Sequence, residues 1–158
     1  MLPMLPQRKN VRLQHFDYHA NGYYFITICC LDKRSLLGTL HQGEIHVSLD
    51  GQHLLEEMFS LERTLRGISV YDYVIMPNHF HLVVEIQREE GDTGMGVSGF
   101  VRLLKGNVTK RSGKSLWQRG YYEHVIRQDE SLQEIVQYMK NNPRRWELRH
   151  SGDKDILW

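Results

Sequence analysis

The chain has 158 residues and a mass of 18.7 kDa, which suits one domain and is too small for two full enzyme domains. Hydrophobic residues make up 41%, charged residues 25% and the net charge is +1, so the protein is neither disordered, fibrous nor strongly basic overall. Its longest mainly apolar run, residues 23–31, is far shorter than the ~20 residues of a membrane-spanning helix, and the first residues lack a signal peptide's apolar stretch. We therefore expect a cytoplasmic protein without a membrane partner, folded as a single domain over residues 1–158 with extensions at 1–20 and 147–158.

The first predicted element is a buried strand over residues 23–31, where β-branched and aromatic residues follow one another. It contains both cysteines of the chain, Cys29 and Cys30. Neighbouring side chains of a strand point to opposite faces, which predicts two free, buried thiols in a reducing compartment. Residues 36–48 predict a hairpin with its turn at residues 42–43.

The spacing of apolar residues then changes from that of a strand to that of a helix. Leucine and methionine recur every three or four positions over residues 50–65, after an Asp-Gly start, which predicts a helix. Two strands follow, at residues 68–76 and 79–87, and Pro77-Asn78 between them predicts a tight turn.

A glycine-rich connection, residues 90–99, separates the two halves of the expected domain. Ser98 is expected to cap a helix that runs to about Arg111, and residues 121–127 follow as a short strand. Residues 101–149 hold 11 lysines and arginines and 5 aspartates and glutamates, against 9 and 14 in the rest of the chain. This excess predicts a local surface for phosphate groups, with a solvated helix face as the alternative.

The last predicted helix begins at Ser131, which forms a capping-box pattern with Glu134, and ends at Asn142 before Pro143. Without the hairpin, the elements follow the order strand, helix, strand, strand, helix, strand and final helix. This order predicts an α+β fold of the ferredoxin-like, split βαβ type. We expect an antiparallel sheet with helices on one face, an inserted hairpin and an added C-terminal helix.

The strand over residues 79–87 carries the first candidate site residues. A period of two places Phe80 on one face of the strand and His79 and His81 on the other. Side chains two positions apart lie roughly 7 Å from each other, so both imidazoles can converge on one ion. Structural zinc would need about four nitrogen or sulfur ligands, whereas two imidazoles with an oxygen ligand suit Mg²⁺ or Mn²⁺ acting on a phosphate. The alternative is an ordinary histidine pair on a half-exposed strand.

The last predicted helix adds a phenol and a carboxamide. Apolar residues with the spacing of a core stripe begin at Leu132, whereas Tyr138 and Asn142, one turn apart, flank that stripe. Alone, Tyr138 could merely pack its ring and Asn142 could merely end the helix. Together with His79 and His81 they predict a catalytic site, because a phenol near a divalent cation can attack a phosphodiester while a carboxamide oxygen completes the metal shell.

Three blocks of the sequence resemble the signature blocks of single-tyrosine HUH transposases. They are YVIMPNHFHL at residues 73–82, WQRGYYEHVIR at 117–127 and YMKNNP at 138–143. The resemblance is closest to the REP-associated tyrosine transposases and covers residues 23–143. Three ordered blocks are far more specific than any single short motif.

The resemblance implies a nuclease and strand transferase that acts on single-stranded DNA folded into hairpins, with Mg²⁺ or Mn²⁺ as the cofactor. By this match His79 and His81 are metal ligands. Tyr138 matches the nucleophile that forms a 5′-phosphotyrosine, and Asn142 falls where the family carries a polar ligand one turn after the tyrosine.

The basic residues of the second half are then expected to hold the backbone of a DNA hairpin and to do so less well as salt rises. They are Arg102, Lys105, Lys110, Arg111, Lys114, Arg119, Arg127, Arg144 and Arg145. Trp117, Gln118 and His124 match the second block, and packing and DNA contact both stay open as their roles.

Two other functions stay open at this point. A non-catalytic regulator derived from a transposase would bind hairpin DNA through the same basic surface. A metallohydrolase of small molecules would use the two histidines, with or without His124, and would leave the basic residues unexplained. A monomer and a homodimer, in which the tyrosine helix completes the partner's site, are both compatible with the sequence.

Overall fold

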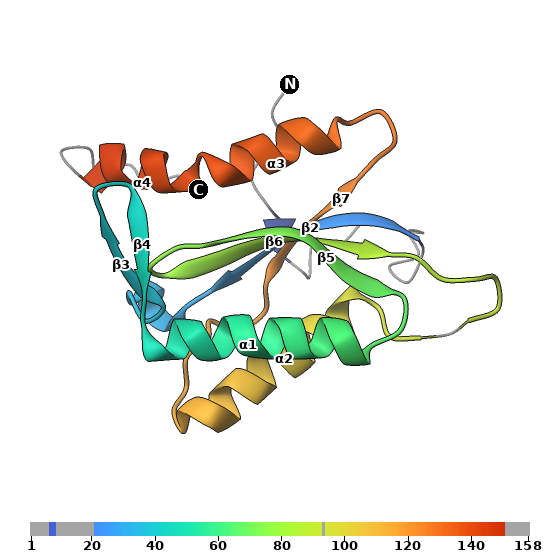
Figure 1. Ribbon diagram of the computed structural model, residues 1–158, viewed down its shortest axis with the longest axis horizontal. Helices are drawn as coiled ribbons and strands as arrows, with labels where there is room; N and C mark the ends of the chain where they lie inside the picture. The colour runs from blue at the N-terminus through green and yellow to red at the C-terminus, as the bar shows by residue number, and fades with distance from the viewer. Residues whose placement is uncertain (1–6, 9–20, 93, 151–158) are drawn as a thin grey trace.

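An antiparallel sheet of five strands forms the middle layer of the protein (Figure 1). The computed structural model describes residues 7–8, 21–92 and 94–150. Across the sheet the strands follow the order β1, β7, β2, β6, β5. Their bounds are β1 (Gln7–Arg8), β2 (Gly22–Cys29), β5 (Ile68–Ile75), β6 (His79–Ile86) and β7 (Tyr122–Ile126). The two halves of the chain are joined in the sheet because β2 pairs with both β6 and β7.

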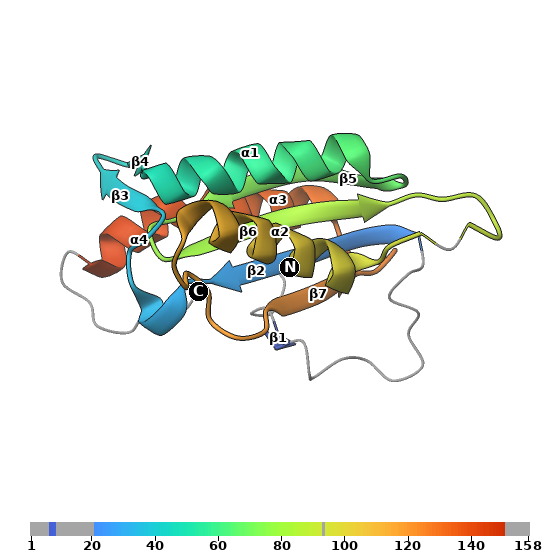
Figure 2. The same ribbon diagram turned by 90° about the horizontal axis from the view of Figure 1, so that it is seen from below.

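Helices cover both faces of the sheet (Figure 1). One pair, α1 (Leu49–Thr64) and α2 (Val97–Ser112), packs side by side on one face, and Figure 2 shows this pair in front of the sheet. The other pair, α3 (Leu132–Lys140) and α4 (Asn142–His150), lies on the opposite face. The ferredoxin-like fold is therefore confirmed, and the added C-terminal helix covers the face that α1 and α2 leave open. No helix in the described ranges is long and apolar enough to cross a membrane.

The predicted hairpin forms between β3 (Gly38–His41) and β4 (Glu44–Val47). Gln42 and Gly43 form its turn, with φ of 51° and 78°, a left-handed conformation that suits a two-residue hairpin loop. A short 3₁₀-helix, η1 (Leu31–Lys33), leads from β2 toward it.

The starts of the first two helices differ from the prediction. Helix α1 begins at Leu49, because the Ser48 hydroxyl accepts a hydrogen bond from Gly51 N at 3.1 Å and caps the helix. Helix α2 begins at Val97 after Gly96, so the predicted cap at Ser98 is wrong and Ser98 lies inside the helix. Burial of the Val97 side chain in the core explains the earlier start.

The C-terminal part contains one helix more than predicted. Ser131 caps α3 as expected, accepting a hydrogen bond from Glu134 N at 3.2 Å. The predicted end at Asn142 is wrong, because α3 ends at Lys140 and Asn142 is the first residue of α4. Pro143 lies in the first turn of α4, where its fixed φ and missing N–H are tolerated. Of the predicted extensions, only residues 7–8 and 147–150 lie within the described ranges, as β1 and the end of α4.

Candidate active site

The two histidines project from β6 toward the face that α3 and α4 cover. The alternation predicted for this strand is confirmed, since Phe80 and Leu82 lie in the core beneath α1 and α2 whereas Val83 packs with residues of α3. The rings of His79 and His81 lie 4.6 Å apart between centroids and are inclined by 75°. Their side chains are only 2% and 0% exposed, so the strand is not half-exposed at this pair, as the alternative interpretation required.

Hydrogen bonds orient both imidazoles through Nδ1. His79 Nδ1 lies 2.6 Å from the carboxamide oxygen of Asn78, and His81 Nδ1 lies 2.7 Å from the Thr27 hydroxyl on β2. Because a carboxamide oxygen only accepts hydrogen bonds, His79 Nδ1 carries the proton and Nε2 carries the lone pair. Metal-binding histidines are held in this way, with one ring nitrogen fixed by a neighbour and the other directed at the ion.

Burial also keeps both imidazoles in the neutral form. It lowers the pKa of His79 to about 3, a shift that the hydrogen bond with the Asn142 side chain partly opposes. Burial likewise lowers the pKa of His81 well below its ordinary value, and the charges of His79 and Arg145 lower it further. Neutral imidazole is the form that binds a metal, so these histidines need no deprotonation near pH 7 to act as ligands.

Helix α4 completes this part of the site with side chains from one of its faces. Asn142 is buried, with 5% of its surface exposed, and its side chain interacts with His79. One turn later the Trp146 ring lies 5.9 Å from the His79 ring. The structure therefore brings together the three predicted metal ligands, although Asn142 lies more than 60 positions after both histidines in the sequence.

The donor set fits a divalent cation that also binds phosphate oxygen. No group of three or more histidine, cysteine, aspartate or glutamate side chains gathers as a metal site within the described ranges. The candidate donors here are two neutral imidazoles and one carboxamide oxygen, which leaves coordination positions for oxygen atoms of a substrate. A mixed nitrogen and oxygen site of this kind suits a catalytic rather than a structural ion.

Tyr138 reaches the same face of the sheet from α3. Its side chain is buried, with 9% exposed, and the guanidinium carbon of Arg145 lies 3.9 Å from the centre of its ring. Arg145 Nη2 also donates a hydrogen bond to the Tyr138 carbonyl at 3.0 Å. Lys140, at the end of α3, forms an ion pair with Asp72 of β5 at 2.7 Å and so ties the helix to the sheet edge. Arg145 is thus the side chain that links the tyrosine to the neighbourhood of the histidines.

The residues of the second sequence block lie outside this cluster. Trp117 packs against the core beneath α1 and α2, and its Nε1 donates to the Lys105 carbonyl at 3.1 Å, which indicates a structural role. His124 pairs with Glu130 at 2.8 Å. On β7, His124 pairs with Phe25 of β2, and Phe25 pairs on its other side with Val83 of β6, two residues after His81. Two strand spacings and two residues along a strand correspond to ~12 Å between the Cα atoms of His124 and His81.

The predicted DNA-binding residues do not form one surface. Those on α2 and in the following loop lie on one side of the sheet, whereas Arg144 and Arg145 belong to α4 on the other. Several are engaged within the protein: Arg111 bridges Glu56 and Glu57, Lys114 pairs with Asp50, and Lys105 donates to the carbonyls of Gln118 and Gly120. Arg102, Lys110, Arg119, Arg127 and Arg144 are exposed.

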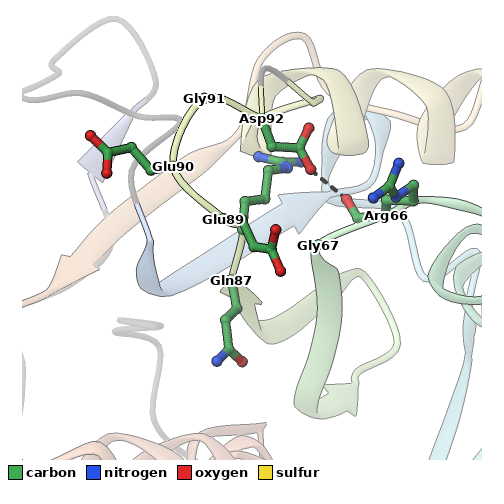
Figure 3. Close-up of a pocket in the computed structure, with 8 residues that line it drawn as sticks. Arg66, Gly67, Gln87, Glu89, Glu90, Gly91 and Asp92 are labelled. Carbon is green, nitrogen blue, oxygen red and sulfur yellow. Dashed lines mark hydrogen bonds between the residues drawn. The ribbon is translucent and has the colours of Figure 1, made fainter.

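A separate polar pocket lies at the other end of β6 from His79 (Figure 3). It has a volume of about 440 Å³ and is lined by Arg66, Gly67, Gln87, Arg88, Glu89, Glu90, Gly91 and Asp92. The Arg88 guanidinium is occupied in holding two loops together, because it donates to the carbonyls of Arg66 and Met95. Three carboxylates in the wall make this pocket unfavourable for a phosphate group.

Comparisons with known proteins identify a family and several relatives of the chain. Residues 20–142 match the profile of a family described as "Transposase IS200 like". The chain is 32% identical to an uncharacterised protein of Haemophilus influenzae, covering 89% of this chain and 90% of that protein. It is 28% identical to the REP-associated tyrosine transposase of Escherichia coli K12, covering 88% and 74%.

A solved structure of a REP-associated tyrosine transposase bound to a REP hairpin has the same fold. It superposes with a TM-score of 0.66 over 85% of this chain and 74% of that one, at 23% sequence identity.

Proposed function

Because the chain belongs to the IS200-like transposase family, we propose that it is a metal-dependent endonuclease and strand transferase of single-stranded DNA, with Tyr138 as its nucleophile. The observation that carries this proposal is the assembly of His79, His81 and Asn142 beside the Arg145–Tyr138 pair on one face of the sheet. These groups come from two distant parts of the chain. A purely structural role would not require two buried imidazoles and a buried carboxamide to gather there.

The substrate that we propose is single-stranded DNA containing a hairpin. One relative of the same fold is bound to a REP hairpin, and that protein shares the REP-associated name with a sequence relative of this chain. Exposed basic side chains such as Arg102 and Arg119 would neutralise backbone phosphates. Cleavage would take place near the hairpin, where unpaired DNA can enter the site.

The reaction that fits this site is a transesterification. The phenol oxygen of Tyr138 attacks the phosphorus atom, the bond from phosphorus to the 3′-oxygen breaks, and the protein is left with a 5′-phosphotyrosine. The phenol proton passes to solvent and the departing oxygen takes up a proton as a 3′-hydroxyl. Because the phosphodiester energy is kept in the new bond, a second 3′-hydroxyl can reverse the step and rejoin the DNA.

The metal-binding residues would be His79, His81 and Asn142, with the two imidazoles binding through Nε2. A bound Mg²⁺ or Mn²⁺ supplies Lewis-acid polarisation of a phosphate oxygen. The chain itself contributes the neutral state of the imidazoles, through burial, and their orientation, through Thr27 and Asn78. No nucleotide cofactor is needed for such an exchange of esters.

A covalent-adduct assay tests the proposal. Protein is incubated with labelled hairpin DNA carrying single-stranded flanks in Mg²⁺ or Mn²⁺ and is then denatured. We expect a labelled adduct with the wild-type protein and with Tyr71→Phe, an exposed tyrosine on β5 that serves as the matched control, and none with Tyr138→Phe. Tight hairpin binding by the wild-type protein without any adduct would reject the enzyme and favour the non-catalytic regulator.

A further inference from the structure

Arg145 differs from three of the other engaged basic residues, while Arg88 and Lys105, like Arg145, donate to backbone carbonyls. Arg111, Lys114 and Lys140 each pair with a carboxylate, whereas Arg145 forms no ion pair with any residue in the described ranges. Its Nη2 hydrogen bond is to a neutral carbonyl, that of Tyr138. Its Nε is buried and has no hydrogen-bond partner there. A partly buried guanidinium without a counter-charge is costly, so this position favours a bound anion.

The position of Arg145 on α4 identifies which anion is suitable. It lies three residues after Asn142 and one before Trp146, and positions three or four apart share a helix face. Asn142 and Trp146 both approach His79, so the guanidinium lies on the helix face that meets the histidine pair. Its carbon also lies 3.9 Å from the Tyr138 ring centre. An anion bound by Arg145 would therefore lie between the nucleophile and the metal ligands.

We propose that Arg145 is a catalytic residue that binds a non-bridging oxygen of the scissile phosphate and makes metal binding depend on bound DNA. The inference rests on the proposed function and adds a residue to it. The planar guanidinium holds the phenol ring by stacking and presents N–H groups to the phosphate. As charge grows on the phosphoryl oxygens in the transition state, the interaction with Arg145 strengthens.

The dependence of metal binding on bound DNA follows from the charges in the site. Without DNA, the guanidinium and a divalent cation near the histidines repel each other, so the metal binds weakly. A phosphate between them attracts both and removes the repulsion. The metal and the DNA should therefore each increase the affinity of the other by the same factor.

Mn²⁺ binding measures this coupling without any cleavage. Free Mn²⁺ is followed by electron paramagnetic resonance during titration of the wild-type protein, Arg145→Gln and Arg63→Gln, the last an exposed control in the final turn of α1. Tyr138→Phe in the background prevents turnover. Without DNA, Arg145→Gln should bind Mn²⁺ about tenfold more tightly than the control. With the hairpin oligonucleotide present, the control should gain at least tenfold in Mn²⁺ affinity and Arg145→Gln should gain little.

Single-turnover adduct formation with Tyr138 intact tests the proposed catalytic role of Arg145. Arg145→Gln should slow the reaction about 10²-fold at saturating DNA, as expected when one charge-stabilising donor is removed. Arg145→Lys keeps the charge and loses the planar fork, so it should recover part of the rate and leave DNA-free Mn²⁺ affinity as in the wild type. Values for Arg145→Gln that equal those of Arg63→Gln in both assays would overturn the inference.

A modified substrate keeps the test valid if Arg145→Gln does not fold. A single methylphosphonate at the scissile position replaces a charged oxygen with a neutral methyl group. With the wild-type protein it should abolish the DNA-induced gain in Mn²⁺ affinity, whereas the same replacement one position away should not. An unchanged gain would overturn the inference. A wild-type protein that forms no adduct on unmodified DNA would instead reject the proposed function.

Discussion

The two faces of the central sheet bury different kinds of side chain, although both kinds come from the same strand, β6. Beneath α1 and α2, β6 contributes Phe80, Leu82 and their neighbours in alternation to a large, mainly apolar core. Beneath α3 and α4, the same strand contributes His79 and His81, next to a much smaller apolar cluster that includes Val83. One face thus holds most of the hydrophobic stabilisation and the other holds polar groups whose burial is unfavourable unless they are partnered. The apolar core therefore stabilises the strand that holds His79 and His81 in place.

Neighbouring residues of β6 test this division most strongly. Phe80→Ala should lower the free energy of unfolding by about 3–5 kcal/mol, because it removes a fully buried ring from the larger core, yet the folded fraction should still form the DNA adduct. His81→Ala should lower adduct formation on the order of 10³-fold while leaving hairpin binding largely intact. Urea unfolding and single-turnover adduct assays measure the two effects. Loss of activity in Phe80→Ala protein that is demonstrably folded would show that the two faces are not separable in this way.

Low pH should destabilise the fold through the histidines on the face beneath α3 and α4. The pKa of His79 is lowered to about 3 by burial, below its ordinary value of 6.5, so the unfolded chain binds a proton that the folded chain does not. Stability is therefore complete above pH 6.5 and falls as the pH decreases toward 3, by roughly 1.4 kcal/mol per pH unit for each such histidine. Urea unfolding at pH 7 and pH 5 should show this loss in the wild-type protein.

The control for this pH effect is a comparison of two histidine variants. His79→Gln removes one buried imidazole and should reduce the loss between pH 7 and pH 5 by about half, since His81 remains. His46→Gln, on the exposed face of the hairpin, should leave the loss unchanged. An identical pH dependence in all three proteins would mean that the imidazoles of the site are not buried in their neutral form.

The serine caps of α1 and α3 allow a comparison with smaller expected effects, because the same substitution can be made on each face of the sheet. Ser48→Ala and Ser131→Ala each remove a side-chain cap and should each cost about 1 kcal/mol. Ser48 also donates to the Leu36 carbonyl at 2.7 Å and starts a helix of the large core, so its loss should appear as global destabilisation. Ser131 starts the shorter helix that carries Tyr138, so its loss should appear as faster hydrogen exchange in α3 and slower adduct formation. Equal global destabilisation, with no change in adduct formation, would contradict this assignment.

Local patterns were sufficient to predict the elements that present the site. The alternation along β6 predicted which side chains share a face, and the Ser131 and Glu134 pattern predicted the start of α3. Both depend on geometry within a few residues. The burial of His79 and His81 was not predictable in this way, because it depends on α3 and α4 folding back over the sheet from more than 50 residues away.

Helix α4 and Arg145 show a second limit of the local patterns. Pro143 was interpreted as a stop, but the same ring restraint that ends one helix is compatible with the first turn of the next. Without that helix, the sequence places Arg145 only among the basic residues expected to hold the DNA backbone. Its spacing of three residues from Asn142 is the signal that would have placed it on the site face, had a helix been predicted there.

The smallest expected effect concerns the charges on the face opposite the histidines. Arg102 and Lys110 on α2 are exposed and form no ion pair with a residue in the described ranges, so they are the α2 side chains best able to neutralise DNA phosphates. Changing both to glutamine should weaken hairpin binding a few-fold and reduce the slope of log affinity against log salt by about 1.4, or 0.7 for each single-strand phosphate that is no longer neutralised. Adduct formation at saturating DNA should equal that of Arg63→Gln, since the proposed catalytic residues lie on the other face. If affinity and salt slope both match that control, the hairpin is held by the α3 and α4 face alone, and one face of the sheet performs both binding and cleavage.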